Sequence, residues 1–160
     1  MEAMMFSYQP ASIDPRSHLG DATVWQFSTV EAHVTCGSGC VIGSCAWIGK
    51  GTVMGDNVRI QHGAFIARGS EIGHRVFIGP NATLTDDKYP RVNNAHYAAN
   101  PPIIEDDVAI GAGAVIHPGV RVRKGTTVGS GAVVIADTTE YSTVVGIPAR
   151  ELAHNPKEYA

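Results

Sequence analysis

The sequence predicts an all-β fold, a parallel β-helix of hexapeptide repeats, from three features that recur together. A large apolar residue stands at every sixth position from Ile42 to Leu84. The residue two places before it is small or β-branched, and the residue after it is most often glycine. A period of six fits neither the 3.6-residue period of an α-helix nor the alternation of a single strand, but it is the repeat of a parallel β-helix. The apolar series is Ile42, Ile48, Met54, Ile60, Ile66, Ile72, Ile78 and Leu84, and the small series is Cys40, Ala46, Thr52, Val58, Ala64, Ser70, Val76 and Ala82.

Each run of six residues should form one wall of a three-sided column. The large residue points inward, the small residue fills the corner, and the glycine lets the backbone turn. Each inward Ile or Val contributes ~1.5–3 kcal/mol on burial, so the core accounts for the stability and the function is expected on the outer surface. The alternative is a set of separate amphipathic strands in an ordinary sheet.

The repeat begins before Ile42 in a different phase. Ile13 and Leu19 are six residues apart, Thr23 takes the corner position, and Trp25 is expected in the next inward slot, as a cap over the first coil. The register then slips by one residue, so that Val30 joins the main series. We expect the slip to be absorbed as a bulge or a corner adjustment.

Residues 85–102 interrupt the repeat with TDDKYPRVNNAHYAANPP, which contains no hexapeptide match. Long irregular loops inside compact domains are uncommon and usually functional, although a solvated insertion without a task is the alternative. A polar tail follows Arg150 and is predicted to include a short helix. After the loop the inward series is Ile104, Ile110, Ile116, Val122, Val128 and Val134, with Val108, Ala114, Val120, Thr126, Ala132 and Thr138 at the corners.

Length and composition indicate one domain over residues 1–160. The formal charge of -3 gives no electrostatic case for binding nucleic acid or an anionic membrane. No segment approaches the ~18 apolar residues of a membrane-spanning helix, and the first residues do not resemble a signal peptide. The three cysteines include no CxxC pair, and Cys40 and Cys45 are expected as buried thiols. A cytoplasmic location is the default expectation.

Several segments resemble one enzyme superfamily. FIGPNATLTDDKYPR, residues 77–91, resembles the segment FxGPSxxFTNxxxPR of bacterial N-acetyltransferases that act on nucleotide-linked amino sugars. LGDATVWQFSTV is similar to the IGxxxxIWxFxxI of the same group, and IGAGAVIHPGVRV and VVGIPAR resemble the coenzyme-binding coils and C-terminal signature of the wider superfamily. The resemblance implies a left-handed parallel β-helix with one protruding loop and a short C-terminal tail.

The same resemblance implies an acetyl-CoA-dependent homotrimer whose active sites lie between neighbouring columns. The most similar group acetylates the 3-amino group of UDP-linked diamino-uronic acids for surface-polysaccharide synthesis. This chain departs from that group in two ways: Asp86 stands where the group usually has Asn, and the loop is shorter. Both departures concern the identity of the sugar rather than the class of reaction.

Asp86 is the first candidate catalytic residue. Three six-residue walls make one coil of eighteen residues. Residues eighteen apart should therefore stack about 4.8 Å apart on adjacent coils, as expected for Lys50, Arg68 and Asp86. Arg68 would then favour the ionised carboxylate. At the start of the loop, Asp86 could orient the attacking amine or accept its proton. The alternative is a surface ion-pair ladder.

His62 is the second candidate base. It lies two residues after an inward position and should point outward, and Gln61 occupies a position that is usually glycine, which suggests a contact with the substrate. A surface histidine without a role is the alternative. The seven histidines include no close pair at metal-binding spacing, so no metal ligands are predicted within the chain.

The remaining candidates are binding residues. The resemblance places the coenzyme on the later coils, where small residues would let pantetheine lie along the wall and basic residues would pair with phosphates. Basic and aromatic loop residues would suit the acceptor's diphosphate, carboxylate or ring. The coenzyme set is Gly111, Ala112, Ala114, Lys124, Gly129, Gly131 and Arg150, and the acceptor set is Gln61, Arg68, Lys88, Tyr89 and Arg91.

The sequence therefore predicts an acetyl-CoA-dependent N-acetyltransferase with a nucleotide-linked amino sugar as acceptor. One alternative is O-acetylation of a sugar or small molecule with His62 as base, because an alcohol needs a stronger base than an amine does. Another is a metalloprotein like the γ-carbonic anhydrases, which requires histidines that meet across a subunit boundary.

Overall fold

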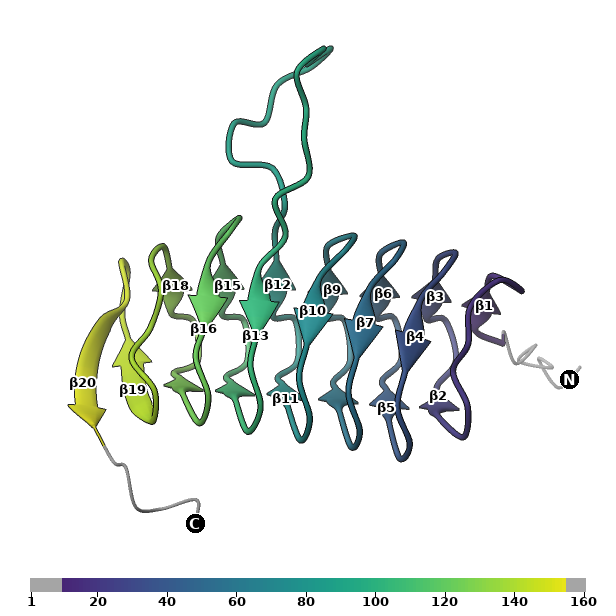
Figure 1. Ribbon diagram of the computed structural model, residues 1–160, viewed down its shortest axis with the longest axis horizontal. Helices are drawn as coiled ribbons and strands as arrows, with labels where there is room; N and C mark the ends of the chain where they lie inside the picture. The colour runs from purple at the N-terminus through teal and green to yellow at the C-terminus, as the bar shows by residue number, and fades with distance from the viewer. Residues whose placement is uncertain (1–9, 155–160) are drawn as a thin grey trace, which may run out of the picture.

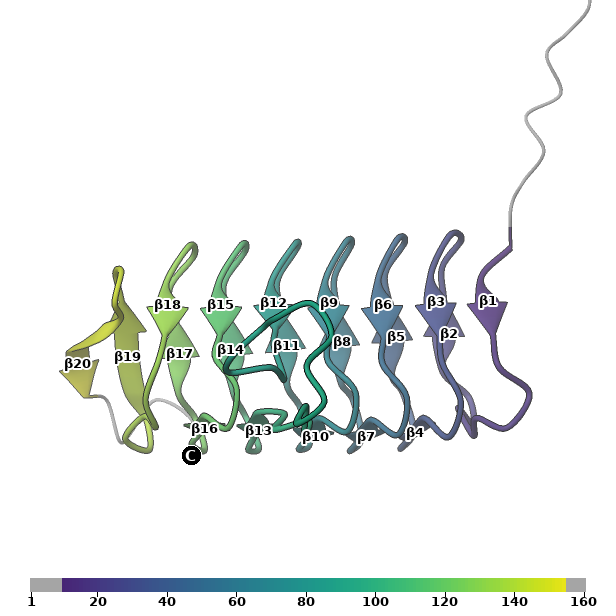
Figure 2. The same ribbon diagram turned by 90° about the horizontal axis from the view of Figure 1, so that it is seen from above.

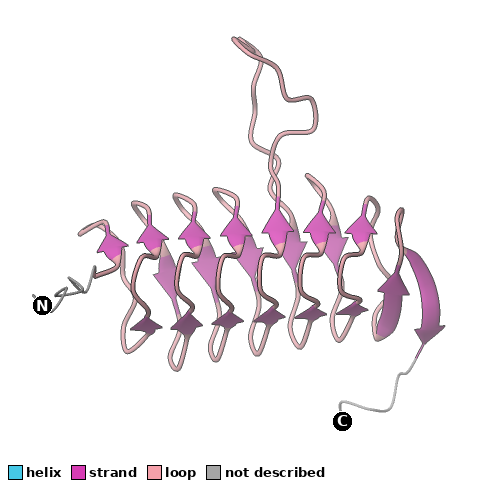
Figure 3. Ribbon diagram, turned by 180° about the vertical axis from the view of Figure 1, so that it is seen from behind, coloured by secondary structure: helices cyan, strands magenta, loops and turns pink. Residues whose placement is uncertain are grey.

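The structure is a computed structural model that describes residues 10–154. These residues form a column with three walls of short strands (Figures 1 and 3). The described residues contain no helix, and therefore none that could cross a membrane. Between residues 29 and 134 the chain visits the walls in the repeated order sheet A, sheet B, sheet C. Every strand pair within a wall is parallel except the last pair of sheet C. This is the left-handed parallel β-helix predicted from the sequence.

Sheet A contains β1 (Ser12–Ile13), β3 (Thr29–Val30), β6 (Trp47–Ile48), β9 (Phe65–Ile66), β12 (Thr83–Leu84), β15 (Val115–Ile116) and β18 (Val133–Val134). Sheet B contains β4 (Thr35–Cys36), β7 (Val53–Met54), β10 (Glu71–Ile72), β13 (Ile103–Ile104) and β16 (Arg121–Val122). Sheet C contains β2 (Thr23–Val24), β5 (Val41–Ile42), β8 (Arg59–Ile60), β11 (Phe77–Ile78), β14 (Ala109–Ile110), β17 (Thr127–Val128), β19 (Ser142–Val145) and β20 (Arg150–His154).

The inward series forms the core as predicted. Ile42, Ile60 and Ile78 stack on one another in sheet C, and each side chain is fully buried. The corner residues are buried with them, including the polar Thr52 and Ser70, whose hydroxyl groups donate to backbone carbonyls of their own turns. Each coil thus covers the apolar face of its neighbour, as expected of a solenoid.

The glycines that follow the inward residues are required by close approach between coils, not by an unusual backbone angle. A Cβ atom at residue 43 would lie 2.7 Å from the backbone nitrogen of His62 in the next coil. Left-handed backbone angles occur later in the turns, for example at Gly51, where φ is +73°. These glycines mark the start of each turn, but the predicted reason, freedom of the backbone to turn, is wrong at these positions, where the spacing between coils requires glycine.

The first coil corrects the predicted register. Val24, not Trp25, pairs with Ile42 in the inward series, and Ala22 rather than Thr23 begins the wall as the corner residue. Trp25 is 48% exposed. The slip therefore lies between Leu19 and Val24, one wall earlier than the expected position between Trp25 and Val30, because the end coil has a neighbour on one side only.

Two further expectations differ from the structure. Cys40 is buried, but Cys45 is exposed, because it occupies a turn position with φ of 60° rather than a corner. Arg150–His154 forms strand β20, antiparallel to β19, where the tail was expected to begin a short helix. The rest of that predicted helix lies outside the described residues.

The three edges of the column are named here by the strands that they connect. The loop corner joins sheet A to sheet B and contains the loop at 85–102; the second corner joins sheet C to sheet A, and the third corner joins sheet B to sheet C. The loop rises from the column between β12 and β13 (Figure 1), and Figure 2 looks down on it. Strand register is kept across it, because Ile72 pairs with Ile104.

Candidate functional site

The loop at 85–102 is closed at its base by backbone hydrogen bonds. The Asn100 N–H donates to the Asp86 carbonyl at 2.9 Å, and the Gly119 N–H on the next coil donates to the Asn100 carbonyl at 2.7 Å. The two ends of the loop are thereby tied to each other and to the column. Asp86 is fixed at this closed neck, so its position is set by the β-helix rather than by the exposed part of the loop.

The Asp86 carboxylate has two partners. The Arg68 Nε lies 3.7 Å from its Oδ2, so the predicted stacking of these two residues on adjacent coils is confirmed. The Tyr97 hydroxyl donates to the same oxygen at 2.5 Å, and the guanidinium of Arg68 lies 5.8 Å from the centre of the Tyr97 ring. The hydrogen bond to the anionic carboxylate raises the pKa of Tyr97, with smaller contributions from partial burial and from the negative charge.

Tyr97 was missed by the sequence reasoning. It lies eleven residues after Asp86 in an irregular loop, where no period relates the two positions. The loop must fold back on itself before the two side chains meet, and that path cannot be derived from spacing.

A hollow of about 540 Å³ lies along the loop corner below Arg68 and is also lined by Lys50. At its far end, Asp14 and Arg16 form a two-point ion pair with distances of 2.8 and 2.9 Å. The Arg16 side chain holds the pKa of Asp14 well below its usual range. Lys50 forms no ion pair within residues 10–154. Glu31 also lines the hollow and accepts a hydrogen bond from the Lys50 backbone N–H at 2.7 Å, so the hollow has mixed charge. Among the residues that the structure describes, its cation without a carboxylate ion-pair partner is Lys50, which could meet an anionic group.

His62 lies at the second corner, across sheet A from Asp86, so a single chain does not bring the two candidate bases together. Its Nδ1 accepts a hydrogen bond from the Ser44 N–H at 3.0 Å. In the neutral ring the proton must then sit on Nε2, which makes that nitrogen a donor. The ring also meets the exposed Trp25 edge-to-face at 6.2 Å. Gln61 beside it is half-buried.

The predicted coenzyme residues fall into three places. Gly111 and Gly129 line a hollow of about 250 Å³ on sheet C, and Arg150 is on β20 at the end of the same sheet. Ala112 and Gly131 are exposed in the same turns of the second corner. Ala114 is fully buried, so its side chain fills the corner instead of lining the surface. Lys124 lies apart at the third corner, where its N–H donates to Glu105.

The predicted acceptor residues of the loop lie beyond its neck. Lys88, Tyr89 and Arg91 are exposed, and the Lys88 Nζ lies 5.7 Å from the centre of the Tyr89 ring. The Tyr89 N–H donates to the Asp87 carboxylate at 2.9 Å, which shapes a local turn. None of the three contacts Asp86 within the described residues.

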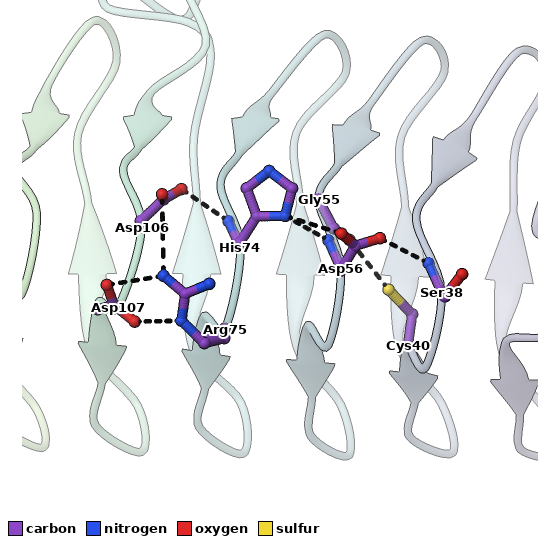
Figure 4. A network of polar contacts seen from close by, with 8 residues as sticks. All are labelled: Ser38, Cys40, Gly55, Asp56, His74, Arg75, Asp106 and Asp107. Atoms are coloured by element: carbon purple, nitrogen blue, oxygen red, sulfur yellow. Dashed lines mark hydrogen bonds and ion pairs between the residues drawn. The ribbon is translucent and has the colours of Figure 1, made fainter.

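A polar network follows the third corner through successive coils (Figure 4). The Ser38 N–H donates to Asp56, the Asp56 N–H donates to His74 Nδ1, and the His74 N–H donates to Asp106. Between residues 10 and 154, no group of three or more His, Cys, Asp and Glu side chains is arranged to hold a metal ion. The network joins coils, since each side chain accepts from the backbone of a neighbouring turn.

A matching family model describes a bacterial transferase hexapeptide with six repeats and covers residues 51–86 and 101–136. A second, the hexapeptide repeat of succinyl-transferase, covers residues 33–68. The fold and these matches define a hexapeptide-repeat protein. The chain belongs to the hexapeptide-repeat acyltransferase superfamily.

Individual relatives have different activities. The chain is 35% identical over 111 residues to a serine acetyltransferase of Bacillus licheniformis, an alignment that covers 69% of this chain and 50% of the relative. It is 45% identical over 78 residues to a 2,3,4,5-tetrahydropyridine-2,6-dicarboxylate N-acetyltransferase of Staphylococcus aureus, covering 49% and 30%. The chain thus spans half of the first relative's length and less of the second.

Among solved structures, the acetyltransferase domain of PglB from Neisseria gonorrhoeae is similar, with a TM-score of 0.54 and 25% identity. The match covers 91% of this chain and 58% of that one. The same domain has been solved in complex with acetyl coenzyme A, and that structure matches with a TM-score of 0.53.

Proposed function

We propose that the chain is an acetyl-CoA-dependent N-acetyltransferase whose acceptor is the amino group of a nucleotide-linked sugar. The observation that carries this proposal is Asp86, a carboxylate fixed at the neck of the loop beside Arg68. Membership in the acyltransferase superfamily and the likeness to the PglB domain, solved with acetyl coenzyme A, support the reaction and the cosubstrate. The sugar's class rests on the motif at residues 77–91.

The reaction proposed is direct transfer. The lone pair of the neutral amine attacks the thioester carbonyl, the C–N bond forms, and a tetrahedral oxyanion develops. The oxyanion collapses, the C–S bond breaks, and the thiolate of CoA leaves. Asp86 orients the amine and accepts its proton, or the departing thiolate takes it. Much of the rate acceleration would come from alignment of the two substrates, and backbone N–H groups of the turns would stabilise the oxyanion.

The charges around the loop neck suit a nucleotide-linked acceptor. Lys50 and Arg68 line the hollow of about 540 Å³ at the loop corner, which has room for a diphosphate. Lys88, Tyr89 and Arg91 on the exposed loop would contact the acceptor from the other side, and Gln61 would do so from the second corner. Fixed cations pair well with phosphate oxygens.

The coenzyme is proposed to lie along the second corner and sheet C. Gly111, Ala112, Gly129 and Gly131 leave the backbone accessible there, and Arg150 lies on the same sheet. Ala114 would contribute through its backbone, because its side chain is buried. Lys124 lies at the third corner, on the other side of sheet C from the second corner, and would have to approach the coenzyme's phosphates from that side.

A homotrimer is part of the proposal. Sheet A separates the two corners that hold Asp86 and His62, and its outer face includes the large apolar side chains of Trp47 and Phe65, each 41% exposed. Exposed apolar patches of this kind mark interaction surfaces. A second copy against this face would bring the second corner of one column near the loop corner of its neighbour. Sedimentation equilibrium should give three times the chain mass.

The second candidate is O-acetylation with His62 as base, which the likeness to serine acetyltransferase supports. His62 would need a free ring nitrogen to remove a hydroxyl proton. In this structure Nδ1 accepts from Ser44, so the ring would first have to release that hydrogen bond. For this reason the amine acceptor is preferred.

One assay separates the candidates. Purified protein is incubated with acetyl-CoA and a panel of UDP- and dTDP-linked amino sugars, with serine and maltose as alcohol acceptors, and thiol release is followed. Rapid release with an amino sugar and an N-acetylated product by mass spectrometry support the proposal. Turnover only with an alcohol would replace it with the second candidate, and stoichiometric zinc in the purified protein would favour a metalloprotein like the γ-carbonic anhydrases.

A further inference from the structure

We propose that Tyr97 is a positioning residue that aims the Asp86 carboxylate at the acceptor. This inference rests on the proposed function and assigns a role to a residue that the sequence motif does not include. Two contacts to one oxygen of the Asp86 carboxylate support it. The Tyr97 hydroxyl and the Arg68 Nε both meet Oδ2 of Asp86, at 2.5 and 3.7 Å.

Both contacts leave the other carboxylate oxygen available. Within residues 10–154, Oδ1 of Asp86 takes part in no hydrogen bond, whereas Oδ2 accepts one from the Tyr97 hydroxyl and lies 3.7 Å from the Arg68 Nε. A carboxylate free to rotate would exchange its two oxygens, whereas a hydrogen bond from a phenol and a cation on the same oxygen fix the rotation. Oδ1 is then the atom that accepts a hydrogen bond from the acceptor's neutral amine and takes its proton as the C–N bond forms.

Tyr97 is itself held by one contact with the column and one within the loop. The guanidinium of Arg68 lies over its ring at 5.8 Å, and the Tyr97 N–H donates to the Asn94 carbonyl at 3.2 Å. Arg68 therefore contacts both members of the hydrogen bond, the ring through its face and the carboxylate through Nε. This closes a three-residue cluster that joins the exposed loop to the regular coil below it.

The end of the loop that contains Tyr97 lies close to the neck. Three residues after Tyr97, Asn100 is bonded through its backbone to Asp86 and to Gly119, which keeps this end of the loop close to the Asp86 carboxylate. A loop without these ties would not hold the phenol in place. The loop therefore holds the Asp86 carboxylate in position as well as contacting the acceptor.

The test is a double-mutant cycle with Tyr97→Phe and Asp86→Ala, in the full chain, measured by thiol release with acetyl-CoA and the best amino-sugar acceptor. Tyr97→Phe should lower kcat about five-fold and leave the KM for acetyl-CoA unchanged, because one charge-assisted hydrogen bond is lost. In the Asp86→Ala background the same change should have no further effect. Val92→Ala, on the same loop and 91% exposed, is the control and should keep full activity.

A spectroscopic measurement tests the hydrogen bond without turnover. With ¹³C-labelled tyrosine, NMR titration resolves the five tyrosines, and the signal missing from Tyr97→Phe is that of Tyr97. Its pKa should lie above the ordinary value and fall towards it in Asp86→Asn, because the negative charge is removed.

Three results would overturn the inference: unchanged kcat in Tyr97→Phe, an equal loss in the Asp86→Ala background, or a Tyr97 titration that does not respond to Asp86→Asn. A wild-type protein that acetylates no amino sugar would count against the proposed function instead, and the NMR titration would still decide whether Tyr97 holds Asp86. Equal unfolding midpoints for Tyr97→Phe and wild type exclude a loss of folding as the cause.

Discussion

Neither Asp86 nor His62 is expected to be indispensable for transfer to an amine when it is changed alone. Asp86→Asn should keep kcat within about ten-fold of the wild type, because the amide oxygen still orients an amine and the departing thiolate can take the proton. His62→Ala should remain active on an amine acceptor, since its Nδ1 is occupied by the Ser44 N–H. Steady-state kinetics with one amino-sugar acceptor measure both.

Loss of activity in either variant would change the assignment of the base. An inactive Asp86→Asn beside a fully active His62→Ala would make Asp86 an obligatory base. An inactive but folded His62→Ala would move the proton transfer to the histidine and favour the alcohol acceptor. Circular dichroism on each variant separates loss of chemistry from loss of the fold.

The cysteines should differ in reactivity. Burial, together with the neighbouring thiol of Cys40, raises the pKa of Cys36 to about 12, and Cys40 is itself buried. Cys45 is exposed. Iodoacetamide at pH 7.5 should therefore alkylate Cys45 in the folded protein and spare the other two, because only the thiolate reacts. Peptide mapping by mass spectrometry checks this, and alkylation of Cys36 at the rate of Cys45 would contradict it.

At the scale of the strand and turn, the repeat made the fold predictable. Each wall must bury one residue against the coils on both sides, so the requirement returns every six residues and is visible in the sequence. The loop cluster obeys no such rule, because Tyr97 meets Asp86 only after the chain has folded back. The Arg68–Asp86 contact could be predicted because both residues keep the period; the Nδ1 hydrogen bond of His62 could not, since it depends on a rotamer.

The misplaced Trp25 shows the limit of the same reasoning. Inside the column, a shift of one residue would turn every following side chain outward, so the register is strongly determined. At the first coil only one neighbour enforces it, and the short wall from Leu19 to Val24 absorbs the slip. The exposed Trp25 then lies beside His62 instead of capping the core.

The Arg75–Asp107 pair joins the coils on either side of the loop insertion and should make stability depend on pH. Two hydrogen bonds of 2.6 and 2.9 Å link the side chains, and the Arg75 side chain lowers the pKa of Asp107. A carboxyl with a lowered pKa stabilises the fold above its unfolded pKa of about 3.9, and this contribution is lost as the pH falls through the folded value.

Asp107→Asn should therefore reduce the loss of stability between pH 5 and pH 3. The effect should stay below about 1 kcal/mol, because Arg75 is largely exposed. Urea unfolding at each pH measures it, and Glu140→Gln, which changes an exposed carboxylate, is the matched control. Equal pH dependence in wild type and Asp107→Asn would show that the pair contributes nothing measurable.

For the molecule as a whole, the β-helix is continuous across the loop, so the fold and the proposed site can be tested separately. The strands on either side of the loop keep their register, with Leu84 paired to Ile116 and Ile104 paired to Ile72, so the column does not depend on the loop's path. Replacing residues 87–102 by Gly-Ser restores the six-residue spacing between Leu84 and Ile104. Closing a shorter loop also costs less conformational entropy.

The shortened protein should therefore keep its β-rich circular dichroism and an unfolding midpoint no lower than that of the wild type. It should lose nearly all acetyl transfer to amino sugars, because Asp86 remains but Tyr97 and the exposed loop cations are gone. A matched replacement of residues 92–95 by Gly and Ser, which keeps both ends of the loop, should retain most of the activity. Full activity in the shortened protein would show that the column alone holds both substrates, and a collapsed fold would show that the loop stabilises it.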